Sequence, residues 1–97
     1  MEILRKISDK SGEFYIEKSG KRVAEMTFVF AGKDILIADH TWVDDSQKGL
    51  GLGKQMFDQL VKYAREHSIK ILATCPYVLH ELKKHREELL DVINRNN

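Results

Sequence analysis

Two side chains of this sequence, the thiol of Cys75 and the imidazole of His40, are candidates for acid–base or nucleophilic chemistry. Cys75 is the only cysteine and stands directly before the only proline, Pro76. Proline is favoured in the first turn of a helix, where free amide groups and the positive end of the helix dipole stabilise a thiolate. A thiol placed there can accept an acyl group or give up a proton, and a histidine can act as a base. Each residue taken alone more often has a structural role, since lone cysteines are commonly small buried core residues.

A third feature is the glycine-rich segment Lys48–Lys54, with the sequence KGLGLGK. Glycines allow successive backbone amides to approach an anion without interference from Cβ atoms, and the start of a following helix adds its positive dipole end. The spacing is not that of a Walker loop, and a third glycine at the offset of a dinucleotide fingerprint is missing. The segment therefore predicts a cradle for a phosphate group, with a ligand-free turn as the alternative.

The elements around these residues follow from the hydrophobic pattern. Segments rich in aromatic and β-branched residues, separated by glycine turns, predict an antiparallel meander. A helical pattern follows, then a short apolar strand and a proline-started helix, so the β-α-β part implies a parallel strand pair. The expected strands are residues 13–18, 21–30, 34–43 and 69–74, and the expected helices are 51–67, one starting at residue 76 and a final segment 87–93. The fold class is thus a mixed α/β sheet.

Length and composition limit the class of protein. The 97 residues are one domain's worth of chain, and we expect a single domain over 1–97. The 16 basic and 15 acidic residues give a net charge of +1 without a basic stripe, which argues against nucleic acid as a partner. No apolar run is long enough to cross a bilayer, and one cysteine cannot form an internal disulfide, so a cytoplasmic location without a membrane is expected. His67, His80 and His85 lack the spacing of metal ligands, so we expect no metal.

Three short motifs together resemble a known family. Lys48, Gly51 and Gly53 occupy the positions of the Gln/Arg-x-x-Gly-x-Gly/Ala signature of GCN5-related N-acetyltransferases. The segments Asp39–Val43, Gly49–Gly53 and Cys75–Val78 are similar to the DHTxV, GxGxG and CPY pattern of the small single-domain branch of that superfamily. The resemblance runs from about residue 13 to residue 85, and Lys48 departs from it by replacing the commoner Arg or Gln.

The resemblance implies a compact fold in which acetyl-CoA lies between two splayed parallel strands and an acetyl group passes to a primary amine. Catalytic roles fall to Cys75, as nucleophile or acid, and to His40, as base. The acceptor is then a small molecule or a protein lysine, and the chain a monomer or a homodimer. The residues that the resemblance places on the cofactor are Thr41, Trp42, Val43, Lys48, Gly49, Leu50, Gly51, Leu52, Gly53, Lys54 and Cys75.

Two departures keep other functions open. Larger family members carry a tyrosine acid about two turns into the helix after the last strand, and this chain has Leu82 there; Tyr77, in the first turn, is not assigned that role. The chain also lacks an evident counterpart of their first strand-helix-helix section. One alternative is therefore a catalytically weak acyl-CoA sensor or interaction module. A nucleic-acid or scaffold protein without a CoA site is the other.

Overall fold

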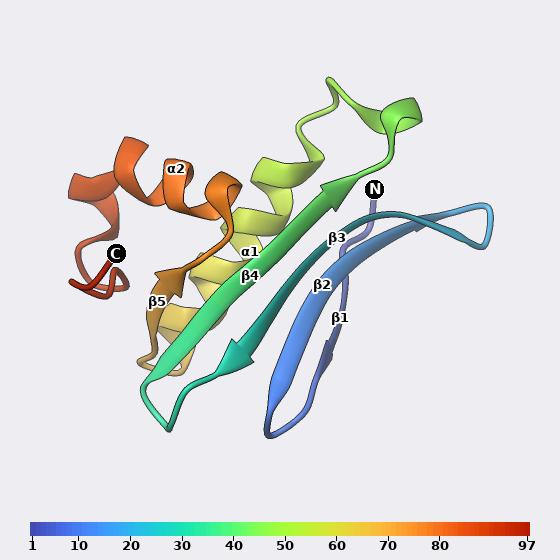
Figure 1. Ribbon diagram of the computed structural model, residues 1–97. Coiled ribbons are helices and arrows are strands. Elements are labelled where there is room, and N and C mark those ends of the chain that lie inside the picture. Colours follow the sequence, from blue (N-terminus) through green and yellow to red (C-terminus); the bar gives the residue numbers. More distant parts are fainter.

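The computed structural model describes residues 1–97 and contains one five-stranded sheet with the strands in chain order, β1-β2-β3-β4-β5 (Figure 1). Pairs from β1 to β4 are antiparallel, and β5 lies parallel to β4 after the crossover through α1. The predicted mixed sheet, a meander followed by a β-α-β unit, is confirmed. The elements are β1 (Leu4–Ile7), β2 (Ser11–Lys18), β3 (Lys21–Phe30), β4 (Ile35–Val43), η1 (Asp45–Gln47), α1 (Leu52–Glu66), β5 (Lys70–Ala73), α2 (Pro76–Lys84) and η2 (Arg86–Leu89).

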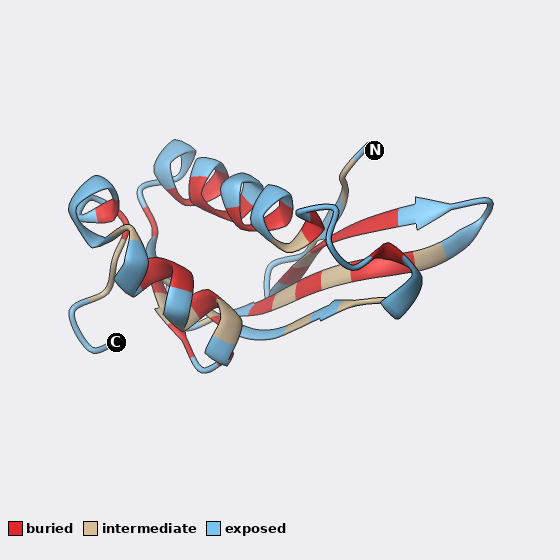
Figure 2. Cartoon of the chain, turned by 90° about the horizontal axis from the view of Figure 1, so that it is seen from above, coloured by how far each residue is buried: buried red, intermediate tan, exposed pale blue.

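Helix α1 covers one face of the sheet and leaves the other face of β2–β4 without a helix (Figure 1). Its apolar residues recur at helical spacing and turn toward the strands, which Figure 2 shows as a buried stripe along the helix. The core joins this stripe to the inward side chains of the meander and to α2. Fully buried members of that core include Phe14, Phe28, Leu36, Met56, Phe57, Leu60 and Val78.

A β-bulge at Asp39 shapes the sheet near the predicted site. Thr27 of β3 pairs with His40, but the next residue, Phe28, pairs with Ala38, so Asp39 is an extra residue in β4. The β4–β5 pairing ends at the same point, with Ala38 opposite Ala73. The amides of Thr74 and Cys75 both donate to the Ala38 carbonyl, each at 3.0 Å, and the chain then turns into α2. The two parallel strands therefore separate beyond Ala38.

The N-terminal strand β1 was not predicted from the sequence. Its four residues pair with β2, and its central Arg5 and Lys6 give it too little apolar character to be recognised as a strand. Of the strand-helix-helix section that we expected to be missing, the strand is therefore present. No helix follows that strand, because the chain returns to β2 through a short turn closed by Ser8 and Ser11.

The C-terminal segment also differs from the prediction. Only Arg86–Leu89 forms a 3-10 helix, after which the chain runs beside β5 and Ile93 makes a parallel bridge to Ile71. The Asn97 side chain continues this contact by accepting from the Ala73 amide at 2.7 Å and donating to the Ile71 carbonyl at 2.8 Å. Pairing with β5 thus overrides the helical spacing of the final residues. Neither helix is long and apolar enough to span a bilayer.

Candidate active site

Cys75 lies at the point where β4 and β5 separate. It is the N-cap of α2, with Pro76 in the first turn as the sequence predicts. Its Sγ donates a hydrogen bond to the hydroxyl of Thr41 on β4 at 3.3 Å, and the residue is only 4% exposed. The thiol is thus enclosed and directed across the gap at one of the predicted cofactor residues.

His40 faces the opposite side of the sheet from that thiol. It pairs with Thr27, whereas Thr41 pairs with the buried Met26, and consecutive residues of a strand point to opposite faces. The imidazole Nε2 lies 3.0 Å from Oε2 of Glu25, and the histidine side chain is half exposed. The structure thus brings Cys75 to Thr41 and His40 to Glu25, and it does not join the two candidate catalytic groups by a hydrogen bond.

Glu25 is a site residue that the sequence analysis missed. It belongs to a chain of charges on the uncovered face, because Nη1 of Arg22 contacts Glu25 at 3.3 Å and also bonds Glu13. The Arg22 guanidinium stacks over the ring of Tyr15 at 4.0 Å. The available signal was the alternation within β3, which places Glu25 on the polar face, but only the register with β4 places it beside His40.

Two glycines of the glycine segment have a left-handed backbone conformation. Gly49 and Gly51 have φ angles of 85° and 73°, in the left-handed region that favours glycine. Gly51 caps α1 without any side-chain hydrogen bond, so no protein side chain occupies the first amides of the helix. At Gly53 an added Cβ would stand 3.1 Å from the ring and hydroxyl of Tyr77, so the first turn of α1 and α2 approach closely here. These amides fit an anionic group such as a diphosphate.

The two lysines of the segment contribute less than the sequence suggests. Lys48 pairs with Asp45 at 2.9 Å, and Lys54 pairs with Asp58 at 2.5 Å. The hydrogen bond to Asp58 raises the pKa of Lys54 and keeps it an ammonium. All four side chains are largely exposed, so these are solvent-screened pairs that an incoming anion can displace.

Gln47 immediately precedes this segment and is buried, with 6% exposure. Its Nε2 donates to Ser46 Oγ at 3.2 Å, while its Oε1 is the one buried side-chain acceptor without a partner within the protein. Buried acceptors are rarely left unpaired, so this oxygen is available to a donor from outside the chain.

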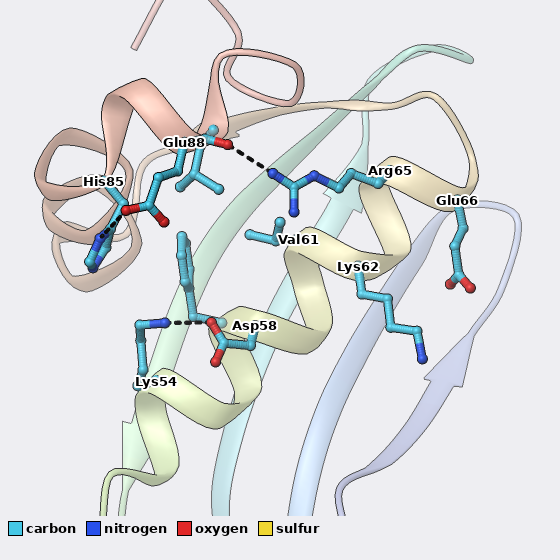
Figure 3. Close-up of a pocket in the computed structure, with 10 residues that line it drawn as sticks. Lys54, Asp58, Val61, Lys62, Arg65, Glu66, His85 and Glu88 are labelled. Atoms are coloured by element: carbon cyan, nitrogen blue, oxygen red, sulfur yellow. Dashed lines mark hydrogen bonds and ion pairs between the residues drawn. The ribbon is translucent and has the colours of Figure 1, made fainter.

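A hollow of about 400 Å³ lies between α1 and the C-terminal η2 (Figure 3). Lys54 from the glycine segment lines one end, and neither Cys75 nor His40 reaches it. Its cations are largely engaged: Lys54 by Asp58, and Arg65 by the Glu88 carbonyl at 2.8 Å and by Asp91 at 2.8 Å. This hollow alone therefore does not define a reaction centre. No three metal-ligating side chains gather anywhere in the chain.

The comparisons with known proteins agree with this fold. A model of the GCN5-related N-acetyltransferase domain matches residues 13–92. The chain belongs to the GCN5-related N-acetyltransferase family. A GCN5-like protein from Staphylococcus aureus, solved by NMR in solution, is 33% identical, with a TM-score of 0.74 over 96% of this chain and 87% of that chain. The protein is therefore an acetyltransferase of this family.

More distant members share the fold alone. The ribosomal-protein-alanine N-acetyltransferase of Brucella melitensis is 23% identical, with a TM-score of 0.61 over 84% of this chain and 64% of that chain. Tetrahymena GCN5 is 14% identical, with a TM-score of 0.64 over 79% of this chain and 51% of that chain. The chain therefore spans less than two thirds of either of these proteins. No curated protein matches it.

Proposed function

We propose that this acetyltransferase moves an acetyl group from acetyl-CoA to the nitrogen of a primary amine. The observation that carries the proposal is the separation of β4 from β5 at the Asp39 bulge, with the Cys75 thiol directed at Thr41 across the gap. The glycine segment follows β4 through η1 and leads into α1, and Gly53 approaches Tyr77 in the helix that Cys75 caps, which supports a cofactor site at this point of the fold.

The residues present fit the CoA part of the substrate. Beyond Ala38, β4 keeps its partner β3 on one side but has no strand on the other. The backbone of Thr41, Trp42 and Val43 can therefore bind an extended pantetheine arm as an added strand would be bound. The amides of residues 48–54, preorganised by two left-handed glycines, would hold the diphosphate. Bound acetyl-CoA supplies an activated acetyl thioester.

The side chains that could move protons lie on the two faces of β4. We assign His40, half exposed on the uncovered face, as the base that takes a proton from the amine. Cys75 has one of two roles. It either returns a proton to the departing CoA thiolate, or its sulfur forms a bond to the acetyl carbon as the C–S bond of CoA breaks, and then passes the acetyl group to the amine. Either role requires the thiol to stay on the Thr41 side of the gap.

A second function, an acyl-CoA sensor with weak chemistry, is favoured by two observations. Leu82 is fully buried where longer members carry the tyrosine acid, and the thiol is only 4% exposed. The sensor and the enzyme share the CoA site and differ only in turnover.

Two measurements test the proposal. Calorimetry with CoA is expected to show binding, and the absence of binding at millimolar CoA would reject both functions and favour a scaffold protein. Acetyl transfer to a panel of primary amines, polyamines and lysine peptides is then followed by mass spectrometry, with Cys75→Ser as the variant. An acetyl adduct on the wild type that is lost in Cys75→Ser indicates covalent transfer; product without adduct indicates direct transfer; CoA binding without product indicates the sensor.

A further inference from the structure

The uncovered face of the sheet carries a hydrogen-bonded chain of charged groups that ends at His40. Arg22 bridges Glu13 and Glu25, and Glu25 accepts from the imidazole at 3.0 Å. We propose that Glu25 is a positioning residue, which holds His40 in the one tautomer that can take a proton from the acceptor amine. The inference rests on the proposed function and extends it to a residue outside the family's motifs.

The contact fixes which ring nitrogen carries the hydrogen. An ionised carboxylate accepts hydrogen bonds and donates none, so Nε2 of His40 must be the N–H nitrogen in the neutral ring. Nδ1 is then the basic nitrogen, and it has no hydrogen-bond partner within the protein. Since the side chain is half exposed, an amine approaching this face can reach Nδ1.

Glu25 is itself held in place. Its side chain is 25% exposed, and its other carboxylate oxygen accepts from Arg22 at 3.3 Å. Arg22 in turn is fixed by Glu13 and by stacking on the buried ring of Tyr15. Glu25 therefore presents one oxygen to Arg22 and the other to the histidine, which restricts rotation of the imidazole.

The other acidic side chain near His40 is engaged differently. Asp39, the bulge residue, accepts from the Thr27 hydroxyl at 2.6 Å and has no hydrogen bond to the imidazole. The positioning role thus falls to Glu25 alone among the acidic residues of this face. Glu66, an exposed glutamate at the end of α1 that contacts neither Arg22 nor His40, provides a matched control.

The two substrates approach the reaction centre from different sides. The thioester lies in the gap between β4 and β5, beside the thiol and the glycine segment, and the acceptor amine enters from the face without a helix. A cationic amine is the expected class of acceptor, because Glu25 and Asp39 carry negative charge on this face. Nδ1 takes one proton from the ammonium, and the neutral nitrogen then bonds to the acetyl carbon as the C–S bond of the thioester breaks. The second proton of the nitrogen passes to the departing CoA thiolate.

The test compares Glu25→Ala, Glu25→Gln and the control Glu66→Ala. Nitrogen-15 NMR of the histidine ring, recorded without substrate, is expected to show the Nε2–H tautomer of His40 in the wild type and in Glu66→Ala. Glu25→Ala is expected to give a mixture of tautomers. Glu25→Gln has a single acceptor oxygen, which Arg22 holds, so its amide NH2 faces Nε2 and is expected to shift the ring to the Nδ1–H tautomer. Backbone spectra of each variant verify the fold.

Kinetics with acetyl-CoA and the best amine of the panel provide the second measurement. Glu25→Ala is expected to lower kcat by about 10- to 100-fold, a part of the roughly 10²- to 10⁴-fold that a positioned base contributes, with KM for acetyl-CoA unchanged. Glu25→Gln is expected to lose at least as much, because it favours the other tautomer of the ring, and Glu66→Ala to stay within about 3-fold of the wild type.

Three results would overturn the inference, and they separate its failure from that of the proposed function. An Nδ1–H ring in the wild type, or a ring spectrum that Glu25→Ala leaves unchanged, refutes the positioning itself. A changed tautomer with unchanged kcat reduces Glu25 to a structural link between β3 and β4. A wild type with the Nε2–H ring that acetylates no amine rejects the proposed function, and the catalytic role of Glu25 with it.

Discussion

The sulfur of Cys75 and the hydroxyl of Thr41, 34 residues apart in the chain, meet at 3.3 Å across the point where β4 and β5 separate. This contact orients the thiol toward the strand whose backbone is free to bind an extended ligand. The cysteine is also a member of the hydrophobic core, so apolar residues enclose it on its other sides.

Replacing Thr41 with valine tests this contact. Thr41→Val keeps the shape of the side chain and removes the acceptor, so we expect a loss of about 1 kcal/mol or less in the free energy of unfolding, since a thiol is a weak donor. Thr41→Ser retains the hydroxyl and is the control, with denaturant unfolding as the measurement. If the serine variant loses as much as the valine variant, the methyl group and not the hydrogen bond is what matters. We further expect acetyl transfer to fall more in Thr41→Val than in Thr41→Ser.

A substitution at Gly51 tests whether the glycine segment binds the anionic part of CoA. Its φ of 73° strains any residue with a Cβ, so Gly51→Ala should cost about 1 kcal/mol of folding stability and weaken CoA binding through a displaced loop. Gly20→Ala is the matched control, because Gly20 has a φ of 75° in the β2–β3 turn, away from the site. Both variants are expected to lose similar stability in denaturant unfolding, but only Gly51→Ala is expected to lose CoA affinity in calorimetry. Equal affinities in the two variants would count against a cradle at Gly51.

Gly53 and Tyr77 are expected to be energetically coupled. Alanine in an α-helix is normally more stable than glycine by about 1 kcal/mol, but at Gly53 the added Cβ meets the Tyr77 ring at 3.1 Å. Gly53→Ala should therefore give little or no stabilisation in the wild-type background and a gain of about 1 kcal/mol in the background of Tyr77→Ala. A double-mutant cycle by denaturant unfolding measures this difference. Equal effects of Gly53→Ala in the two backgrounds would show that the ring moves aside freely.

Tyr77 should also make the stability depend on alkaline pH. Burial, followed by the negative charge of Glu81, raises the pKa of Tyr77 from an ordinary 10.0 to about 12. A phenol whose pKa is raised by folding stabilises the protein at pH values below 10, and this contribution is lost as the pH rises from 10 toward 12. Tyr77→Phe, which cannot ionise, should flatten this part of the stability curve measured by denaturant unfolding between pH 9 and about 11.5. The opposite result, a steeper fall in the variant, would contradict the assignment.

Much of the fold and part of the site could be predicted because the signals are local. The turn glycines, the helical spacing of α1 and the proline after Cys75 each act within a few residues, and they correctly place the meander and the start of α2. The Glu25–His40 contact could not be predicted, because it depends on the register between β3 and β4 and on a one-residue bulge that no local pattern marks. For the same reason β1, whose central residues are charged, is recognisable only from its pairing with β2.

The segment that lies along β5 has a consequence for self-association. Ile93 and Asn97 occupy hydrogen-bonding positions beside that strand, so a second copy cannot extend the sheet there without first displacing them. The opposite border is β1, where Arg5 and Lys6 would bring like charges together if two such strands aligned. Joining two sheets end to end is therefore obstructed at one border and electrostatically disfavoured at the other, which helps keep a small sheet with one bare face from growing into fibres.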